Sequence, residues 1–294
     1  MNIEEIEIAT GINEHQSASY ELHDKMIDFE PSKNLSYSDI ITLSKGLNLI
    51  SEFYDVNAVI SINAIGICGA ALGKTLEDAV NYVIDSNPID FISSTVCISK
   101  EVDSDLAKML KDVHIVAAPS FTKNAKDYLE THGVVYVQIK TPLKEYKKYL
   151  SNTEIVTPLG KLIQSPNLSE LNKDSFKVVS KTKPTVEQIE DAVFAWKIAK
   201  HANSKAIIIA KDLKTTAIAQ GLQSASVEYA LDSSCDRSKD AILASDLGIT
   251  LHDFNVAIQG RIALLVIPCA SKELIALADK YNVGIIVTGL TNLS

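Results

Sequence analysis

Residues 184–210 read PTVEQIEDAVFAWKIAKHANSKAIIIA, and this stretch decides the fold class. Thr185 follows a proline and stands three residues before Gln188, the pattern of a capping box that begins a helix. Apolar residues then recur at steps of three and four from Ile189 to Ala199, which predicts a helix with one buried stripe. The run Ala206–Ala210 lacks alternation and is β-branched at its centre, as in a strand covered on both faces. A helix followed by such a strand indicates an α/β sheet.

The chain after this strand continues the same pattern. Residues 211–214 form a turn, Thr215–Ala219 are expected to return as a second strand, and a second helical run is expected to end at Ala244-Ser245-Asp246.

An earlier part of the chain repeats this unit. Ala58 and Ala206 begin apolar runs 148 residues apart, and Pro119 and Pro268 end apolar runs 149 residues apart. An offset this constant across several elements predicts an internal duplication. We therefore expect two α/β units, one with an N-terminal lead-in in residues 1–150 and one with a connector in residues 151–294.

The first unit is expected to alternate strands with helices. Residues 1–34 read as an acidic lead-in without a strong period, and residues 140–183 as a proline- and lysine-rich connector. The expected elements between them are a helix over 35–53, strands over 58–62, 91–98, 114–118 and 134–139, a small-residue segment over 67–72, and helices over 75–84, 104–110 and 123–131.

Composition excludes several classes of protein. At 294 residues and 46% hydrophobic content the chain can bury a large core. A net charge of −9 argues against nucleic acid or an anionic membrane as the main partner. The longest apolar runs fall short of a membrane span, and no charged-then-apolar leader is present. Four scattered cysteines without a CxxC pair are typical of a cytoplasmic protein with reduced thiols.

Familiar chemical motifs are incomplete in this chain. Gly69 to Thr75 resembles a phosphate-binding loop but has three residues between its glycines instead of four. The Pro-Cys of Pro268-Cys269 lacks the second cysteine of a zinc deaminase, and no His-x-Glu occurs, so no metal ligands are predicted. His201 falls at a helix C-terminus, where the helix dipole favours an imidazolium. Cys97 and Cys269 read as small core residues rather than nucleophiles.

Several segments in order resemble the formyltransferase part of the bifunctional purine-synthesis protein. These are Gly11–Gln16, Leu35-Ser36-Tyr37, Cys68-Gly69, Gly160–Gln164, Phe194–Lys197, His201–Ile207, Ala244-Ser245-Asp246 and Val287-Thr288-Gly289. The resemblance is to phosphoribosylaminoimidazolecarboxamide (AICAR) formyltransferase and covers nearly the whole chain, while the family's cyclohydrolase part has no counterpart in these residues. It implies two tandem three-layer α/β/α units of the cytidine-deaminase type.

The resemblance also implies where the site lies and shows departures there. The family's catalytic Lys-His pair is replaced by Asn63 and Ala64, and the asparagine that polarises the formyl group is replaced by Lys205. A basic opening residue is replaced by Ala9, the Phe-Gly-Gly turn by Ile92-Ser93-Ser94, and the basic C-terminal segment by residues 290–294. The resemblance therefore yields no catalytic residue at these positions, and its ligand-binding candidates are His15, Gln16, Asn63, Ser93, Ser94, Gln164, Lys205 and Asp246.

Three functions follow from this comparison. The first is a homologue of impaired or lost catalysis, a pseudoenzyme that binds a nucleotide-like small molecule or a protein partner. The second is a formyltransferase that uses 10-formyltetrahydrofolate and AICAR, with Lys205, Asn63 and Asp246 as relocated catalytic groups. The third is a new enzyme on the old scaffold. Because the family is dimeric with shared sites, a homodimer or a heterodimer with a paralogue is expected, and no covalently bound cofactor.

Overall fold

The computed structural model describes residues 4–8, 10–13, 15–22, 26–171, 176–221 and 226–291. Its first half begins with a small separate hairpin of β1 (Glu4–Ile8) and β2 (Ala18–Leu22). The elements that follow are β3 (Phe29–Pro31), α1 (Tyr37–Ile50), the 3₁₀ turn η1 (Ser51–Phe53), β4 (Ala58–Ile62), β5 (Ile67–Leu72), α2 (Leu76–Ser86), α3 (Pro88–Phe91), β6 (Thr95–Ile98), α4 (Ser104–Met109), β7 (Ile115–Ala118), α5 (Lys123–Thr131) and β8 (Val135–Ile139).

The second half is preceded by a connector that carries a projecting hairpin. The 3₁₀ segment η2 (Leu143–Tyr149) leads into β9 (Thr153–Thr157) and β10 (Gly160–Gln164), which pair with each other and which we call the arm. The remaining elements are β11 (Lys177–Val178), α6 (Val186–His201), β12 (Ile207–Lys211), β13 (Lys214–Ala219), α7 (Ser226–Ser234), η4 (Cys235–Ser238), β14 (Ile242–Ser245), α8 (Leu251–Gln259), β15 (Leu264–Ile267), α9 (Lys272–Tyr281) and β16 (Gly284–Val287).

One 12-stranded sheet runs through both halves, in the order β11-β16-β15-β14-β12-β13-β5-β4-β6-β7-β8-β3. The two halves meet at β13 and β5. Counted outward from there, β5, β4, β6, β7, β8 and β3 of the first half correspond to β13, β12, β14, β15, β16 and β11 of the second. The registers agree as well, since Ile115 pairs with Val135 in the first half and Leu264 with Gly284 in the second. These paired residues are 149 positions apart, so the expected correspondence of the two halves is confirmed at the level of strand order and register.

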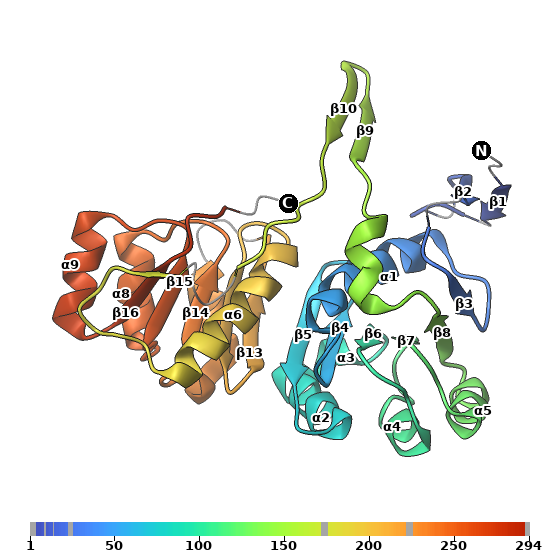
Figure 1. Ribbon diagram of the computed structural model, residues 1–294, viewed down its shortest axis with the longest axis horizontal. Helices are drawn as coiled ribbons and strands as arrows, with labels where there is room; N and C mark the ends of the chain where they lie inside the picture. Colours follow the sequence, from blue (N-terminus) through green and yellow to red (C-terminus); the bar gives the residue numbers. More distant parts are fainter. Residues whose placement is uncertain are drawn as a thin grey trace.

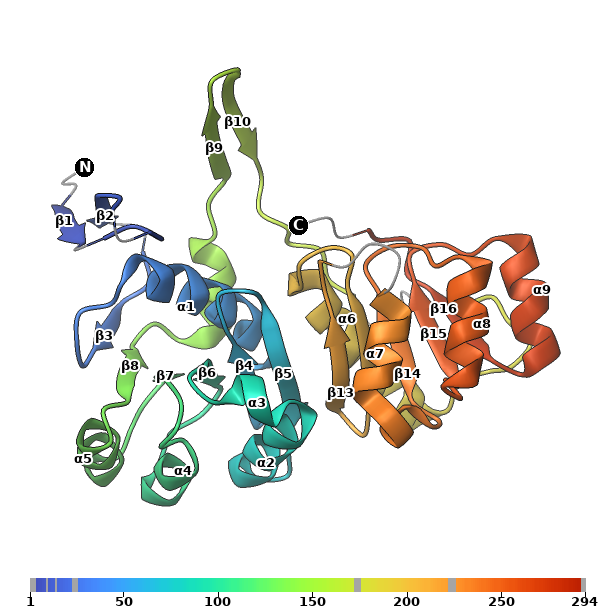
Figure 2. The ribbon, with the colours of Figure 1, turned by 180° about the vertical axis from the view of Figure 1, so that it is seen from behind.

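Helices cover both faces of the sheet, which confirms the α/β class. Helices α1 and α6 share one face, and Figure 1 shows α6 in front of the second half. Helices α2, α4 and α5 cover the other face of the first half, while α7, α8 and α9 cover that of the second, as the view from behind shows (Figure 2). The apolar core under α1 and α6 is continuous between the halves, so the halves are packed as one body.

Helices α1 and α6 begin in the same way. The hydroxyls of Ser36 and Thr185 accept a backbone N–H from the third helical residue, and that residue's side chain accepts the N–H of the cap in return. This confirms the capping box predicted at Thr185, and the two caps lie 149 residues apart. The predicted single buried stripe of α6 is wrong, because Phe194, Ala195 and Ile198 are buried too, enclosed by α1 and the sheet.

The two halves meet at a short seam between β5 and β13. A single residue pair, Ala71 with Lys214, aligns there, and the backbone N–H of Leu72 donates to the carbonyl of Leu213 at 2.9 Å. Side chains complete the seam at either end. The Thr215 hydroxyl bonds both backbone groups of Ala70 at 3.0 and 3.1 Å, and the Gln220 amide donates to the carbonyl of Ile67 at 2.8 Å.

Several boundaries differ from the sequence expectations. Ala244 and Ser245 lie in strand β14 and not at the end of a helix, because the polar stretch before them closes α7 at Ser234. Phe91 ends the short helix α3, where an asparagine cap and Pro88 favour helix over strand. The lead-in and the connector contain short strands that their weak periodicity did not reveal. Across the described residues no helix is both long and apolar enough to cross a membrane.

Candidate functional site

Some of the residues expected to form a site lie at one edge of the sheet. Strands β4, β5, β13 and β12 run alternately up and down, so the end of β4, the start of β5, the end of β13 and the start of β12 lie at the same edge. Asn63 follows β4, and Lys205 precedes β12. The fold therefore brings these two positions, 142 residues apart in sequence, to a common edge, as the resemblance implied.

Asn63 is occupied in holding its own loop. Its side-chain oxygen accepts the N–H groups of Ile65 and Gly66 at 2.9 and 3.1 Å, and its backbone N–H donates to the carbonyl of Gly66 at 3.0 Å. This is the local bonding that makes asparagine common in turns. Ala64 is exposed and offers no titratable group. The loop is thus stable without a ligand, and it presents no base.

The segment after α6 is fixed against this loop. The Asn203 side chain donates to the carbonyl of Ile65 at 2.6 Å. The carboxylate of Asp246, fully buried, accepts the Ser204 hydroxyl at 2.6 Å and the backbone N–H of Ala206 at 2.8 Å. Lys205 lies between these anchors with an exposed side chain. Asp246 is therefore a clamp for the segment that carries Lys205, and its oxygens are already used.

Ser93 and Ser94 also lie at this edge, next to the end of β4. The buried Ser94 hydroxyl accepts a hydrogen bond from Ser61 and donates to the carbonyl of Phe91, both at 2.8 Å. Ser93 has a left-handed backbone (φ 63°) and an exposed side chain. Of the pair, Ser93 is therefore the one with its side chain open to a ligand.

The other candidates lie elsewhere. His15 and Gln16 are exposed in the turn between β1 and β2, where the Gly11 N–H donates to the Gln16 carbonyl at 2.7 Å. Gln164 is exposed on the arm, which projects from the body (Figure 1). Within one chain these three do not join the Asn63 edge. Ala9 and residues 292–294, where the family's basic residues were expected, lie outside the described residues.

A cavity of about 670 Å³ opens where β5 and β13 diverge below the seam. Polar side chains reach it from both halves, namely Asn63, Ser86, Asp90, Gln220, Tyr229, Ser233 and Arg237. Gly66 lets the Gln220 side chain approach closely here, because a Cβ at this position would stand 2.3 Å from it and displace it. Burial and the nearby Asp90 raise the pKa of the Cys68 thiol to about 12, so this lining thiol is not a nucleophile at neutral pH.

Arg237 is the cationic residue of this lining, and sequence reasoning passed over it. Its Nε and Nη2 donate to the carbonyls of Ser234 and Ser233 at 3.2 and 3.1 Å, and Nη1 donates to the carbonyl of Asp85. Three of its five N–H groups are used in this way, which leaves donors for an anion. The sequence could have pointed to Arg237, because the chain has only two arginines and arginine is the usual ligand for phosphate.

The comparisons with known proteins match this chain over most of its length. The sequence model of the family described as AICARFT/IMPCHase bienzyme matches residues 3–232. The chain belongs to that family. It is 33% identical over 266 residues to the bifunctional purine biosynthesis protein PurH of Caldicellulosiruptor saccharolyticus, covering 88% of this chain and 51% of that protein. With the protein of the same name from Fusobacterium nucleatum it shares 30% over 302 residues, covering 97% and 58%. It thus spans just over half the length of these relatives.

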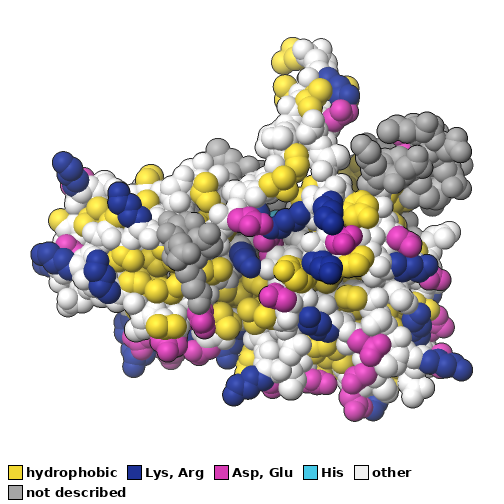
Figure 3. All heavy atoms as spheres, viewed as in Figure 1, with side chains coloured by type: hydrophobic (Ala, Val, Ile, Leu, Met, Phe, Trp, Pro, Cys, Tyr) yellow, Lys and Arg dark blue, Asp and Glu magenta, His cyan; other side chains and the backbone are white. Residues whose placement is uncertain are grey.

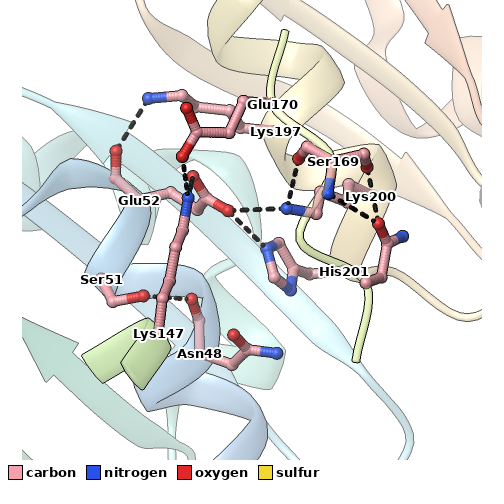
Figure 4. A network of polar contacts seen from close by, with 10 residues as sticks. Asn48, Ser51, Glu52, Lys147, Ser169, Glu170, Lys197, Lys200 and His201 are labelled. Atoms are coloured by element: carbon pink, nitrogen blue, oxygen red, sulfur yellow. Dashed lines mark hydrogen bonds and ion pairs between the residues drawn. The ribbon is translucent and has the colours of Figure 1, made fainter. Parts of the chain in front are cut away.

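This AICARFT/IMPCHase family member contains a buried charge cluster that the sequence did not reveal. Figure 4 shows Glu52 of η1 at its centre, reached by Lys147 from η2 and by Lys200 and His201 from the end of α6. The Glu52 carboxylate lies 2.9 Å from the Nζ of Lys200, 3.1 Å from that of Lys147 and 3.4 Å from the Nε2 of His201. Its backbone carbonyl accepts the Lys197 ammonium at 2.8 Å.

Burial and pairing oppose each other in this cluster. Burial by itself would keep Glu52 protonated, but hydrogen bonds from His201 and Lys200 hold its pKa well below the ordinary range. Burial also lowers the pKa of His201 despite its bond to Glu52. The imidazolium expected from the helix dipole is therefore wrong, because desolvation outweighs the dipole in a site this enclosed.

These shifts predict loss of stability on acidification. A group whose pKa is lowered by folding stabilises the native state above its unfolded pKa and loses that contribution as the pH falls. For His201 the loss starts near pH 6.5, and for Glu52 near pH 4.3. We expect the urea midpoint to fall between pH 7.5 and pH 5, and the fall to be smaller in His201→Gln. The exposed histidine variant His252→Gln is the control, and an equal slope in both variants would contradict the assignment.

Proposed function

We propose that this chain is an AICAR formyltransferase-like protein of purine biosynthesis ancestry that retains a ligand site but has impaired or lost catalysis. The observation that carries this proposal is the state of the Asn63 edge. Asn63 is bonded within its loop, Ala64 has no titratable group and Asp246 is consumed as a clamp. Formyl transfer to an amine needs a proton acceptor and a donor for the developing oxyanion. Of these, only the exposed ammonium of Lys205 is offered as a donor.

The cavity below the seam supports retained binding of a nucleotide-like ligand. Its volume of about 670 Å³ is within the range of small-molecule sites. Amide and hydroxyl groups suit a base and a ribose, and the remaining donors of Arg237 suit a phosphate.

Thermal unfolding in the presence of AICAR tests binding. A ligand at 100 times its Kd stabilises the folded chain by about 2.7 kcal/mol, so wild type should show a clear rise in Tm. Arg237→Gln should lose most of this rise, whereas Arg261→Gln, on a different surface and paired with Asp236, should keep it. No shift with millimolar AICAR in wild type would remove binding from the proposal.

A second candidate is a working enzyme with a relocated base, and one observation favours it. The backbone N–H of His114 donates to the carbonyl of Ser94 at 2.9 Å, which places His114 at the same edge as Asn63. Its Nε2 lies 2.9 Å from the Asp39 carboxylate, and a carboxylate-oriented imidazole is a common general base. Lys205 would then supply the charge for the formyl oxygen.

This candidate makes its own prediction. If any AICAR formylation is detected, His114→Ala should reduce it by about 10² to 10⁴, the usual contribution of a general base. His132→Ala removes a helix-end histidine whose ring bonds the carbonyl of Tyr128 and stacks on the Tyr128 ring, and serves as the control. Residual activity that is unchanged in His114→Ala would exclude His114 as the base.

We also propose that the chain associates, as a homodimer or with a paralogue. The arm exposes five large apolar side chains, and yellow atoms mark it in Figure 3: Ile155, Val156, Leu159, Leu162 and Ile163. A two-stranded hairpin without a covered face is marginally stable in water. A second chain over the arm would bury this surface, and it would bring Gln164 to a site in the partner.

Sedimentation tests this association. We expect a dimer at micromolar concentration, and Leu162→Glu should shift the population to monomer because it places a charge within a buried apolar contact. Val186→Glu changes an equally exposed apolar residue on α6 and should leave the dimer intact. A wild-type monomer at micromolar concentration would contradict the homodimer, and a paralogue that restores association would favour the heterodimer.

A further inference from the structure

The segments that flank the arm are both tied to one buried carboxylate, the first directly and the second through Lys200. Before the arm, Lys147 of η2 contacts Glu52 at 3.1 Å. After the arm, the carbonyl of Ser169 accepts the Lys200 ammonium at 2.8 Å, and the same ammonium lies 2.9 Å from Glu52. Figure 4 shows these groups converging from η1, from η2, from the connector and from α6. The direction of the arm relative to the sheet therefore depends on Glu52.

The same carboxylate holds the turn that leads to the candidate site. Lys200 and His201 are the last two residues of α6, and the N–H of Ala202 still bonds to the carbonyl of Ile198 at 3.1 Å. The next residue, Asn203, bonds the loop of Asn63 through Ile65. Only Ala202 separates His201 from Asn203, so we expect a shift of the α6 end to shift Lys205.

Burial makes these contacts obligatory rather than incidental. The side chains of Glu52 and Lys200 are 7% and 2% exposed. A charge removed from water to this extent must keep its partners, since an unpaired buried charge costs several kcal/mol. Glu170 is different, because its side chain is 73% exposed and touches only Lys147 within the cluster. It adds a surface ion pair, which contributes little.

We propose that Glu52 is a positioning residue that couples the arm to the candidate site, by holding the segments that flank the arm and the last turn of α6 at one point. A molecule that binds the arm then changes the positions of Lys205 and Asn63, and a ligand bound at the candidate site changes the position of the arm in return. The coupling to ligand rests on the proposed function; the positioning itself does not.

Hydrogen exchange of the full chain tests the positioning of the site. In Glu52→Gln we expect the amides of Asn203 and Ala206 and of the Asn63 loop to exchange at least about tenfold faster, a change of about 1.4 kcal/mol in local opening. Strands β7 and β15, which lie in the middle of each half, should report the loss of overall stability in Glu52→Gln, and they should return close to wild-type exchange in the double variant Glu52→Gln with Lys200→Met. Glu170→Gln is the matched control and should change neither region.

Electron spin resonance distances test the arm. Spin labels at Leu159→Cys on the arm tip and Lys123→Cys on α5, in a Cys235→Ser and Cys269→Ser background, report the arm within one chain when diluted with unlabelled protein. We expect a narrow distribution in wild type and in Glu170→Gln, and a broad one in Glu52→Gln. If Glu52→Gln fails to fold, the double variant Glu52→Gln with Lys200→Met removes both buried charges and should show the same loosening.

Two results would overturn the proposal. One is an unchanged distance distribution and unchanged exchange at residues 203–206 in a folded Glu52 variant. The other is exchange at residues 203–206 that returns to wild type together with strands β7 and β15 in the double variant, which would make Glu52 a general stabiliser. A missing AICAR response in wild type would instead contradict the ligand site, and it would leave both readouts of positioning intact.

Discussion

Steady-state formylation of AICAR by the purified protein, with saturating 10-formyltetrahydrofolate, should be at least about a thousandfold slower than in an active family member. This corresponds to roughly 4 kcal/mol of barrier. The lost proton acceptor and the lost neutral donor are each worth about 2 to 4 kcal/mol in comparable systems, although such contributions do not simply add.

The triple variant Asn63→Lys, Ala64→His and Lys205→Asn is the informative control for this experiment. It restores the residue types that the family resemblance assigns to these positions, yet it should recover little activity. The turn at Ser93 and Ser94 is altered as well, and in this chain Asn63 has become the bonded centre of its own loop. Wild-type turnover within tenfold of an active relative would refute the impaired reading and assign Lys205 a catalytic role.

The largest expected effect on stability is at Glu52. Glu52→Gln removes the charge that pairs the buried Lys200 ammonium, and breaking a buried ion pair from one side costs about 3 to 5 kcal/mol. Chemical denaturation should show this as a lower free energy of unfolding with little change in the m-value.

Two further variants separate pairing from packing at this position. Glu52→Gln combined with Lys200→Met should recover much of the loss, because replacing both members of a buried pair by uncharged side chains is often close to neutral. Glu170→Gln should cost no more than about 1 kcal/mol, since its ion pair is exposed to water. A double variant as unstable as the single one would show that the carboxylate acts through packing instead of charge.

Much of the fold could be predicted because short stretches of sequence indicate its helices and strands, and because these stretches recur in the second half. The caps at Thr185 and Ser36, the fully apolar strands and the constant offset near 149 residues each follow from short stretches of sequence. The prediction of a single buried stripe on α6 was wrong because α1, which buries the other side of α6, is distant in sequence. Strands β1 to β3 were missed because they have five residues or fewer, and the arm was missed because its apolar residues are adjacent, Ile155-Val156 and Leu162-Ile163, and so show no alternation.

The candidate site was only partly predictable. Resemblance placed Asn63, Lys205 and Asp246 in correspondence with family positions, and strand order brought them to one edge. It could not show that the oxygens of Asn63 and Asp246 are already bonded, since those bonds depend on the local course of the backbone. Glu52 was missed for a physical reason: one glutamate at a helix end reads as a solvated charge until the connector and α6 enclose it.

The capping residues of α1 and α6 are 149 positions apart, and so are Glu52 and His201, which contact each other between the two halves. Equivalent positions of a duplicated unit thus meet with unlike side chains, an acid against a base. Were a first half to pair with the first half of another copy, two glutamates would face each other in a dry interface, and like charges there cost several kcal/mol. Tandem units are prone to exchange between chains during folding. The divergence of this residue pair therefore disfavours the pairing of two like halves and favours the union of a first half with a second half.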